Sequence, residues 1–204
     1  MTQAVSWRVS SRRAQQKEST RQALFARAMQ LFSERGYEAV SVEDIVTAAS
    51  VARGTFYFHF PSKEDVLLEA VRRGERHIVG RMAAVADRPL LEVLVATTEG
   101  FAEVWGGHRE LLPHAGAVGI RRIAQVAGER DHEPLRLELV QHVERALAAG
   151  ALRSPLPAQM LADVFLLDVF AALMSWAATG QPPLSIVMRG VIELYLGGVG
   201  LGRA

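Results

Sequence analysis

Cysteine is absent from this 204-residue sequence, which excludes disulfide bonds and thiol chemistry. The six histidines show no paired metal-ligand spacing such as H-E-x-x-H, and the sequence has no glycine-rich phosphate loop or nucleophile elbow. Asp163 and Asp168 stand five residues apart, a spacing that does not bring two carboxylates close together on one helix face. We therefore expect no catalytic residues, no metal site and no cofactor, and an enzyme is the least favoured class of function.

An uninterrupted apolar run of membrane-spanning length is also missing. The N-terminal arm has no long apolar core, so it does not have the form of a secretory signal. The one membrane candidate, residues 156–178, contains Asp163 and Asp168, each of which costs about 2.5–3.5 kcal/mol near a bilayer centre. We interpret this segment as a buried helix, and we expect a cytoplasmic protein that makes no membrane contact.

Strand patterns, internal repeats and low-complexity tracts are not found, so we expect an all-α fold. The first helix is expected from about Ser19 to Arg35, with Gly36 as the residue that ends it. Further helices are expected at about 62–86, 90–105, 110–114, 118–127, 133–149, 158–179 and 184–199, separated by glycine and proline.

The segment from Ser41 to Lys63 carries the most specific pattern. Ser41 is a suitable N-cap with Asp44 three residues on, and apolar residues then recur at helical spacing. A second helix starts near Arg53 and ends before Pro61, because the residue preceding a proline is disfavoured in the helical region. Two short helices joined by a tight turn form a helix-turn-helix, whose second helix enters the major groove of DNA.

The second of these helices divides its side chains between a core face and an exposed face. Phe56 and Phe60 stand four residues apart, so we expect them in the core. Thr55, Tyr57 and His59 fall largely on other faces, where solvent or a partner would meet them. Methyl groups and aromatic rings suit the thymine methyl group, and hydroxyl groups suit phosphate oxygens.

Three further residues of this segment suit DNA. Arg53 begins the second helix and is included among the expected DNA contacts. Gly54 lets the start of the helix approach another surface closely, and its free amide suits a phosphate. Lys63, one of only two lysines beside 21 arginines, lies in the first turn of the next helix, where the dipole disfavours a cation. A DNA phosphate would supply the compensating anion.

The run Val51–Glu64, VARGTFYFHFPSKE, resembles the DNA-binding motif of the TetR family of bacterial transcriptional regulators. The shared pattern is a Gly-Thr pair, a tyrosine two residues after the threonine, an aromatic or histidine pair, and a lysine that opens the next helix. The resemblance covers residues 19–69. It implies that Thr55, Tyr57 and His59 face DNA and that Ser41 and Lys63 hold phosphates.

Two residues within the resemblance qualify these expectations. Ser50 stands where the family usually has glycine, and a positive φ at that position would cost a serine about 1 kcal/mol. Glu43, early in the first helix of the pair, would be repelled by phosphate, so that helix face is not counted as a DNA contact.

Charge is unevenly distributed along the chain. Residues 1–63 carry nine basic and five acidic side chains, a net charge of +4, whereas residues 64–204 carry 14 and 17, a net charge of −3. Near the N-terminus Glu18 is the one acid beside six basic residues: Arg8, Arg12, Arg13, Lys17, Arg21 and Arg27. This basic arm either contacts phosphates or the minor groove, or is a solvated and disordered terminus.

The last two expected helices are unusually apolar. Nearly every residue from Val164 to Met174 is apolar, and a helix that is apolar around most of its circumference must be buried on several sides. We expect a homodimer in which the helices at 158–179 and 184–199 of each subunit form a four-helix interface, as the resemblance also implies. The alternative is burial within a monomer. A dimer would place two recognition helices on a palindrome-like site.

The resemblance also implies an unidentified small-molecule effector bound inside the later helices. Candidate lining residues, each with core or surface placement as the alternative, are Phe101, Trp105, His108, His114, Phe170 and Trp176. We expect a flexible basic arm at residues 1–17, a helix-turn-helix domain at 18–64 and an effector-binding and dimerisation domain at 65–204. The predicted function is a repressor released from double-stranded operator DNA by its effector. The alternatives are an activator, a ligand-independent regulator or an architectural DNA-binding protein.

Overall fold

The computed structural model describes residues 4–125 and 134–199, and these residues contain no β-strand. The all-α fold class is therefore confirmed. Contacts divide the chain into two compact units, Met1–Leu67 and Leu68–Ala204. The boundary expected after residue 64 lies three residues before this division.

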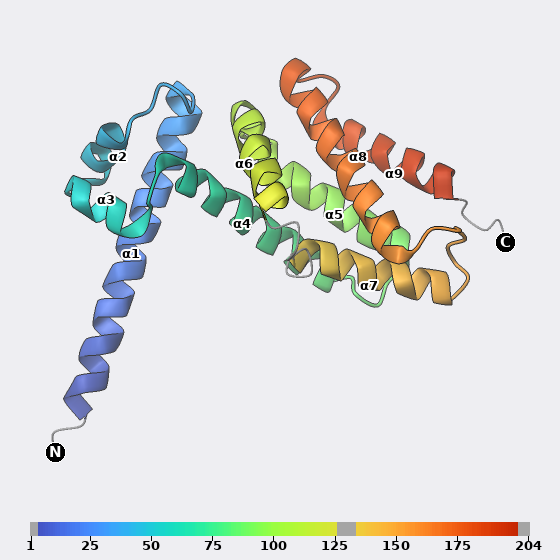
Figure 1. The fold of residues 1–204 in the computed structure, drawn as a ribbon, viewed down its shortest axis with the longest axis horizontal. Coiled ribbons are helices and arrows are strands. Elements are labelled where there is room, and N and C mark those ends of the chain that lie inside the picture. Colours follow the sequence, from blue (N-terminus) through green and yellow to red (C-terminus); the bar gives the residue numbers. More distant parts are fainter. Residues whose placement is uncertain (1–3, 126–133, 200–204) are drawn as a thin grey trace. The chain divides into compact units, whose positions relative to one another are not determined.

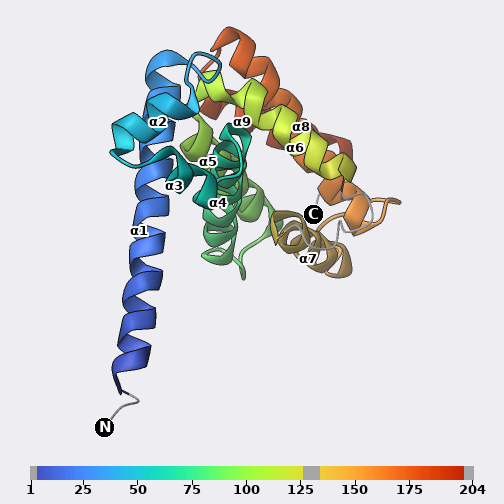
Figure 2. The same ribbon diagram turned by 60° about the vertical axis from the view of Figure 1, so that its left-hand side comes forward.

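The N-terminal unit contains three helices and the start of a fourth: α1 Ala4–Arg35, α2 Val42–Ala49, α3 Arg53–His59 and α4 Lys63–Ala83. Figures 1 and 2 both show α2 and α3 lying against the part of α1 nearer its C-terminal end. The core between these helices is apolar and fully buried, and it includes Leu24, Ala28, Phe32, Ile45, Phe56 and Phe60. Burial of these aromatic side chains fixes α3 on the unit and decides which of its residues remain outside.

The start of α1 differs from the expectation. The helix begins at Ala4 rather than near Ser19, so the arm expected to be flexible at residues 1–17 is helical from Ala4 onward. Residues 4–19 contain neither glycine nor proline, and nine of the sixteen are alanine, arginine, glutamine, lysine or glutamate, which favour helices. They lack an apolar stripe, which is why periodicity did not reveal them. The C-terminal end of α1 is as expected, because Gly36 has a φ of +83° and its amide donates to the Phe32 carbonyl at 2.9 Å.

The C-terminal unit contains the rest of α4 and six further elements: α5 Leu90–Trp105, the 3₁₀-helix η1 Arg109–Leu111, α6 Leu112–Gln125, α7 Pro134–Ala148, α8 Ala158–Thr179 and α9 Leu184–Val199. Helix α8 packs against α6, α7 and α9, and α9 also packs against α5 (Figure 1). Phe165 and Val169 of α8 are fully buried, and the Tyr195 hydroxyl of α9 donates to the Leu161 carbonyl at 3.0 Å. Burial raises the pKa of Tyr195 to about 12.

Most bounds in this unit agree with the expected ranges, and α5, α8 and α9 match theirs. The expected helices at 110–114 and 118–127 are instead η1 followed by the single helix α6. Pro113 lies in the first turn of α6, where its missing amide proton is not needed. At Gly116 a β-carbon would lie 3.1 Å from both Phe170 and Met174 of α8, so this glycine allows close packing rather than ending a helix. Residues 126 and 127 of the expected range lie outside the described residues. Helix α4 ends at Ala83 instead of about residue 86.

Candidate nucleic-acid interface

Helix α2 has a capping box at its start and a left-handed residue at its C-cap, where the turn to α3 begins. The Ser41 hydroxyl accepts from the Asp44 amide at 3.1 Å, and the Ser41 amide donates to the Asp44 carboxylate at 2.8 Å. The Ser41 hydroxyl also donates to the Asp44 carboxylate, and this bond and the one from the Ser41 amide, with a smaller contribution from Arg35, hold the pKa of Asp44 below its usual value. The expected N-cap is confirmed, and the Ser41 side chain remains exposed.

Ser50 ends α2 with φ 53° and ψ 44°, which is the left-handed conformation. Its amide donates to the Thr47 carbonyl at 3.1 Å, so the conformation closes the helix. The positive φ considered in the sequence analysis is therefore present, at a cost of about 1 kcal/mol for a serine.

Helix α3 places two aromatic side chains inside and two outside. Phe56 and Phe60 are buried as expected, whereas Tyr57 is 44% exposed and Phe58 is 67% exposed. The Arg53 guanidinium donates to the Tyr57 hydroxyl at 3.4 Å and lies 5.7 Å from the centre of its ring. We call the exposed side chains Arg53, Tyr57 and Phe58 the recognition surface.

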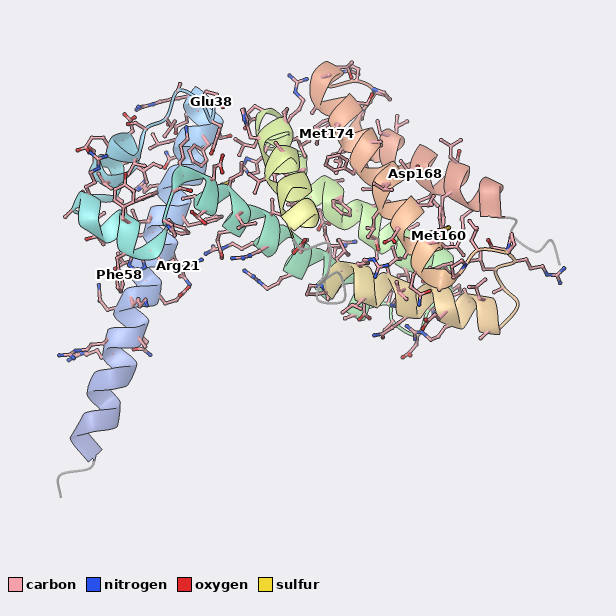
Figure 3. The ribbon with its side chains drawn as sticks, viewed as in Figure 1. Arg21, Glu38, Phe58, Met160, Asp168 and Met174 are labelled. Carbon is pink, nitrogen blue, oxygen red and sulfur yellow. The ribbon has the colours of Figure 1, made fainter. Side chains whose placement is uncertain are left out.

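The sequence analysis missed Phe58. Its position is two residues from both Phe56 and Phe60, about 200° around the helix, so the two buried phenylalanines place it on the opposite side. Phe58 and Arg21 are labelled in Figure 3, where they lie near one another at the end of α3 beside α1. Phe58 and Tyr57 together leave exposed aromatic surface on α3, and contiguous exposed apolar surface is typical of sites that bind a partner.

His59 corrects the expectation that it lies on an exposed face. Its side chain is 8% exposed, and Nδ1 is buried without a hydrogen-bond partner among the described residues. Burial, together with the positive charges of Lys17 and Arg21, lowers the pKa of His59. The Arg21 guanidinium donates to the His59 carbonyl at 3.3 Å. His59 thus lies at the junction of α3 and α1, where its protonated form is disfavoured.

Lys63 also differs from its expected environment. Its ammonium group donates to the carbonyl oxygens of Tyr37 at 2.7 Å and Val40 at 3.0 Å, and lies 4.2 Å from the centre of the Tyr37 ring. The loop between α1 and α2 therefore supplies the compensating negative charge that the sequence analysis assigned to DNA. Lys63 fastens this loop to the start of α4. An ammonium group has three N–H donors, so one donor of Lys63 remains after the bonds to the two carbonyls.

Gly54 and Thr55 occupy the first turn of α3. Gly54 is exposed, and a β-carbon built on it would meet nothing within 4 Å. The fold itself does not require a glycine at this position. The Thr55 side chain is half-buried, and its amide donates to the Ala52 carbonyl at 2.9 Å.

The six side chains expected to line an effector site come from four parts of the C-terminal unit: α5, the residue before η1, α6 and α8. Trp105 and Trp176 are buried, and the other four are half-buried. Two of the six carry a buried nitrogen without a hydrogen-bond partner among the described residues, Nδ1 of His108 and Nε1 of Trp176. Phe170 lies against Gly116 of α6.

Helices α8 and α9 leave a second group of apolar side chains exposed. We call Met160, Val164, Leu167, Ile186 and Leu194 the apolar face. The three from α8 follow one another at spacings of four and three residues and so share one side of that helix. By length and composition alone α8 also qualifies as a membrane span, with 33% of its most apolar window buried, but core helices of other proteins pass the same test.

The fold and the recognition surface together define an all-α helix-turn-helix protein. Residues 24–70 match the family model of bacterial regulatory proteins of the tetR family. The chain is 36% identical over 87 residues to the transcriptional repressor KstR2 of Rhodococcus jostii, covering 40% of this chain and 43% of that protein. It is 37% identical over 67 residues to the regulator EthR of Mycobacterium tuberculosis, covering 33% of this chain and 31% of that protein. These alignments span less than half of the relatives' lengths.

One solved structure extends the likeness to most of the chain. The TetR-family repressor FadR of Thermus thermophilus, in complex with lauroyl-CoA, superposes with a TM-score of 0.68 at 26% identity. The match covers 90% of this chain and 97% of that one. The resemblance drawn from the sequence is confirmed: residues 24–70 match the tetR-family model, and the fold is similar to that of a TetR-family repressor over most of the chain.

Proposed function

We propose that this chain is a sequence-specific DNA-binding transcriptional regulator, a repressor that a small-molecule effector releases from a palindrome-like operator. The observation that carries the proposal is the recognition surface. Its rings and guanidinium stand outside a helix whose other aromatic residues, Phe56 and Phe60, already fill the core. Tyr57 meets Phe56 and Phe58 meets His59 edge to face, yet both rings keep a large exposed area that the core does not use.

The chemistry of the recognition surface matches the major groove. The Arg53 guanidinium suits the two acceptors of guanine, and the rings of Tyr57 and Phe58 suit thymine methyl groups. Gly54 has open space around it and lets the backbone of α3 come close to DNA. Ser41, Thr55 and the third donor of Lys63 are suited to phosphate oxygens, which fix orientation without reading sequence. His59 supports α3 from the inside.

A homodimer follows from the apolar face. Leu167 is 64% exposed and Leu194 is 78% exposed, on helices that pack against each other within one chain. A second copy of the same face would remove these side chains from water, and a two-fold axis would relate the two α3 helices. Such a dimer binds inverted half-sites, which one seven-residue helix does not do alone.

The effector is expected among the helices of the C-terminal unit. The unpartnered nitrogens of His108 and Trp176 support a polar contact for it there. Because the FadR protein of similar fold was solved with lauroyl-CoA, acyl-CoA thioesters are the first class to test. A coupling of about 1–3 kcal/mol between effector and DNA is enough for a working switch.

The proposal is tested with the DNA upstream of the chain's own gene and a scrambled duplex as competitor. Tight binding that the scrambled duplex does not displace is expected, and lauroyl-CoA is expected to release the DNA. Equal, salt-sensitive binding to both duplexes would favour an architectural protein. Absence of binding to either duplex at low salt would contradict DNA binding altogether.

A further inference from the structure

The N-terminal part of α1 continues beyond the helix-turn-helix core. Figures 1 and 2 show α1 extending past α3 toward the N-terminus. Residues 12–19 are all exposed, so the other described elements of the chain leave this part of α1 largely in solvent. This projecting part of the helix contains a concentration of positive charge, with Glu18 as its one acid. Glu18 accepts from the Gln22 side chain at 3.1 Å.

Two contacts fix which side of α1 faces the recognition helix. The Lys17 ammonium lies 4.7 Å from the centre of the Phe58 ring, and the Arg21 guanidinium lies 4.7 Å from that of Phe60. Lys17 and Arg21 stand four residues apart and so share this side. The same side continues into the buried residues Leu24 and Ala28. The positive charge at this end of α3 is therefore placed by the packing of α1.

Arg13 stands four residues before Lys17 and continues the line. At 1.5 Å and 100° per residue, Arg13 lies about 12 Å along the axis from Arg21 and about 40° around the helix from Lys17. Arg12 is nine residues from Arg21, about two and a half turns, so it points away from this side. We call Arg13, Lys17 and Arg21 the basic stripe.

We propose that the basic stripe binds the phosphate backbone of DNA beside the base pairs that α3 contacts. The inference rests on the proposed function and names a second, sequence-independent contact surface for it. Lys17 touches Phe58, so a duplex that meets the recognition surface also meets the stripe. Duplex DNA carries one charge per about 1.7 Å of axis, and a line of cations about 12 Å long therefore faces several phosphates.

This contact is rigid, unlike a disordered basic arm. The helix fixes the spacing of the three cations before binding, so little conformational entropy is lost when phosphates replace their counterions. Contacts of this type set position and affinity but do not read sequence. The stripe should strengthen binding to operator and scrambled DNA equally.

The test compares two arginines that are neighbours in sequence and point to different sides of α1. Dissociation constants are measured against salt concentration for the full-length wild type, Arg13→Ala with Lys17→Ala, Arg13→Ala alone and Arg12→Ala. The probes are the duplex upstream of the chain's own gene and a scrambled duplex of equal length. Thermal unfolding of each variant shows that it is folded, and Arg13→Lys serves as the charge-conserving rescue.

For each subunit bound to DNA, the double variant is expected to lower the slope of log K against log salt by nearly two, and Arg13→Ala by nearly one, on both duplexes. Arg12→Ala should leave the slope within half a unit of wild type. Equal losses for Arg12→Ala and Arg13→Ala, or wild-type slopes for the double variant, would overturn the stripe while leaving DNA binding intact. A wild type that binds neither duplex would instead remove the proposed function, and the stripe with it.

Discussion

The two units of the chain each leave apolar side chains in water, and the two surfaces differ in chemistry. On α3 the exposed groups are aromatic, Tyr57 and Phe58, and cations stand over their rings. On α8 and α9 the exposed apolar groups are Met160 and the four aliphatic side chains of the apolar face. An aromatic surface with guanidinium and ammonium groups suits bases and phosphates, whereas a mainly aliphatic one suits another aliphatic surface.

This difference separates two kinds of partner that exposure alone does not distinguish. Both surfaces lie on helices whose other faces are well packed, so neither is explained by poor folding. The polar groups around Tyr57 provide donors for DNA, and the side chains around Leu167 offer mainly burial. We therefore expect changes at the two surfaces to have separable effects on oligomeric state and on DNA preference.

The largest effect is expected from charging the apolar face. The double change Leu167→Glu and Leu194→Glu should convert the dimer to a monomer, because four carboxylates would be desolvated in its interface. Loss of the second half-site should weaken operator binding about 10²–10⁴-fold. Sedimentation measures the oligomeric state, and titration with operator DNA measures the affinity. Leu91→Glu changes an exposed leucine on α5 and is the matched control. A fully dimeric double variant would place the interface elsewhere.

The next effect is expected from the recognition surface. Tyr57→Ala should reduce the preference for operator over scrambled DNA about 10²-fold, because a base contact is lost in each half-site. The dimer should remain intact in sedimentation. Phe58→Ala provides the comparison for the exposed aromatic residue that the sequence analysis missed. Loss of the dimer in Tyr57→Ala, with unchanged DNA preference, would show that the two surfaces are not separable.

Lys63 is expected to contribute to stability more than to DNA binding. Lys63→Ala leaves the carbonyls of Tyr37 and Val40 without their donor, which should lower the free energy of unfolding by about 1–3 kcal/mol. If the third donor holds a phosphate, the salt slope also falls by about one for each subunit bound to DNA. Urea unfolding measures the effect on stability, and salt titration measures the effect on DNA binding. Lys17→Ala is the control, expected to change the slope and leave stability near wild type.

The smallest effect is expected from pH. Burial lowers the pKa of His142, where Arg145 donates to Nδ1 at 2.9 Å, and burial and nearby cations lower that of His59. Glu138 opposes the shift at His142. Because the unfolded state binds more protons, stability is complete above about pH 6.5 and falls as pH decreases below it. The midpoint of urea unfolding, measured at two pH values, reports this loss of stability. The loss should be smaller in His142→Gln. A pH-independent midpoint would contradict neutral buried histidines.

Much of the fold was predictable from local pattern. Ser41 with Asp44, Gly36 with its positive φ, and the spacing of Phe56 and Phe60 are short-range signals, and each is found in the structure as expected. The ranges of α8 and α9 followed from apolar runs bounded by glycine and proline. The early start of α1 was missed because residues 4–19 have helix-forming composition but no apolar stripe.

The candidate site was predictable in its elements and less so in its contacts. Position around α3 placed Tyr57 outside, but the packing of His59 against α1 depends on residues about 40 positions away. Lys63 was assigned to DNA because its partners, the carbonyls of the α1–α2 loop, become neighbours only on folding. Helix periodicity reports faces, and it does not report which neighbouring element covers a face.

Selection of duplexes from a random library by the full-length protein tests the central claim most directly. The account predicts enrichment of an inverted repeat whose two half-sites are separated by about one helical turn or a multiple of it. Tyr57→Ala should lose this enrichment. A library that remains unenriched, or that yields a single unrepeated motif with the dimer intact, would contradict recognition of DNA by paired α3 helices.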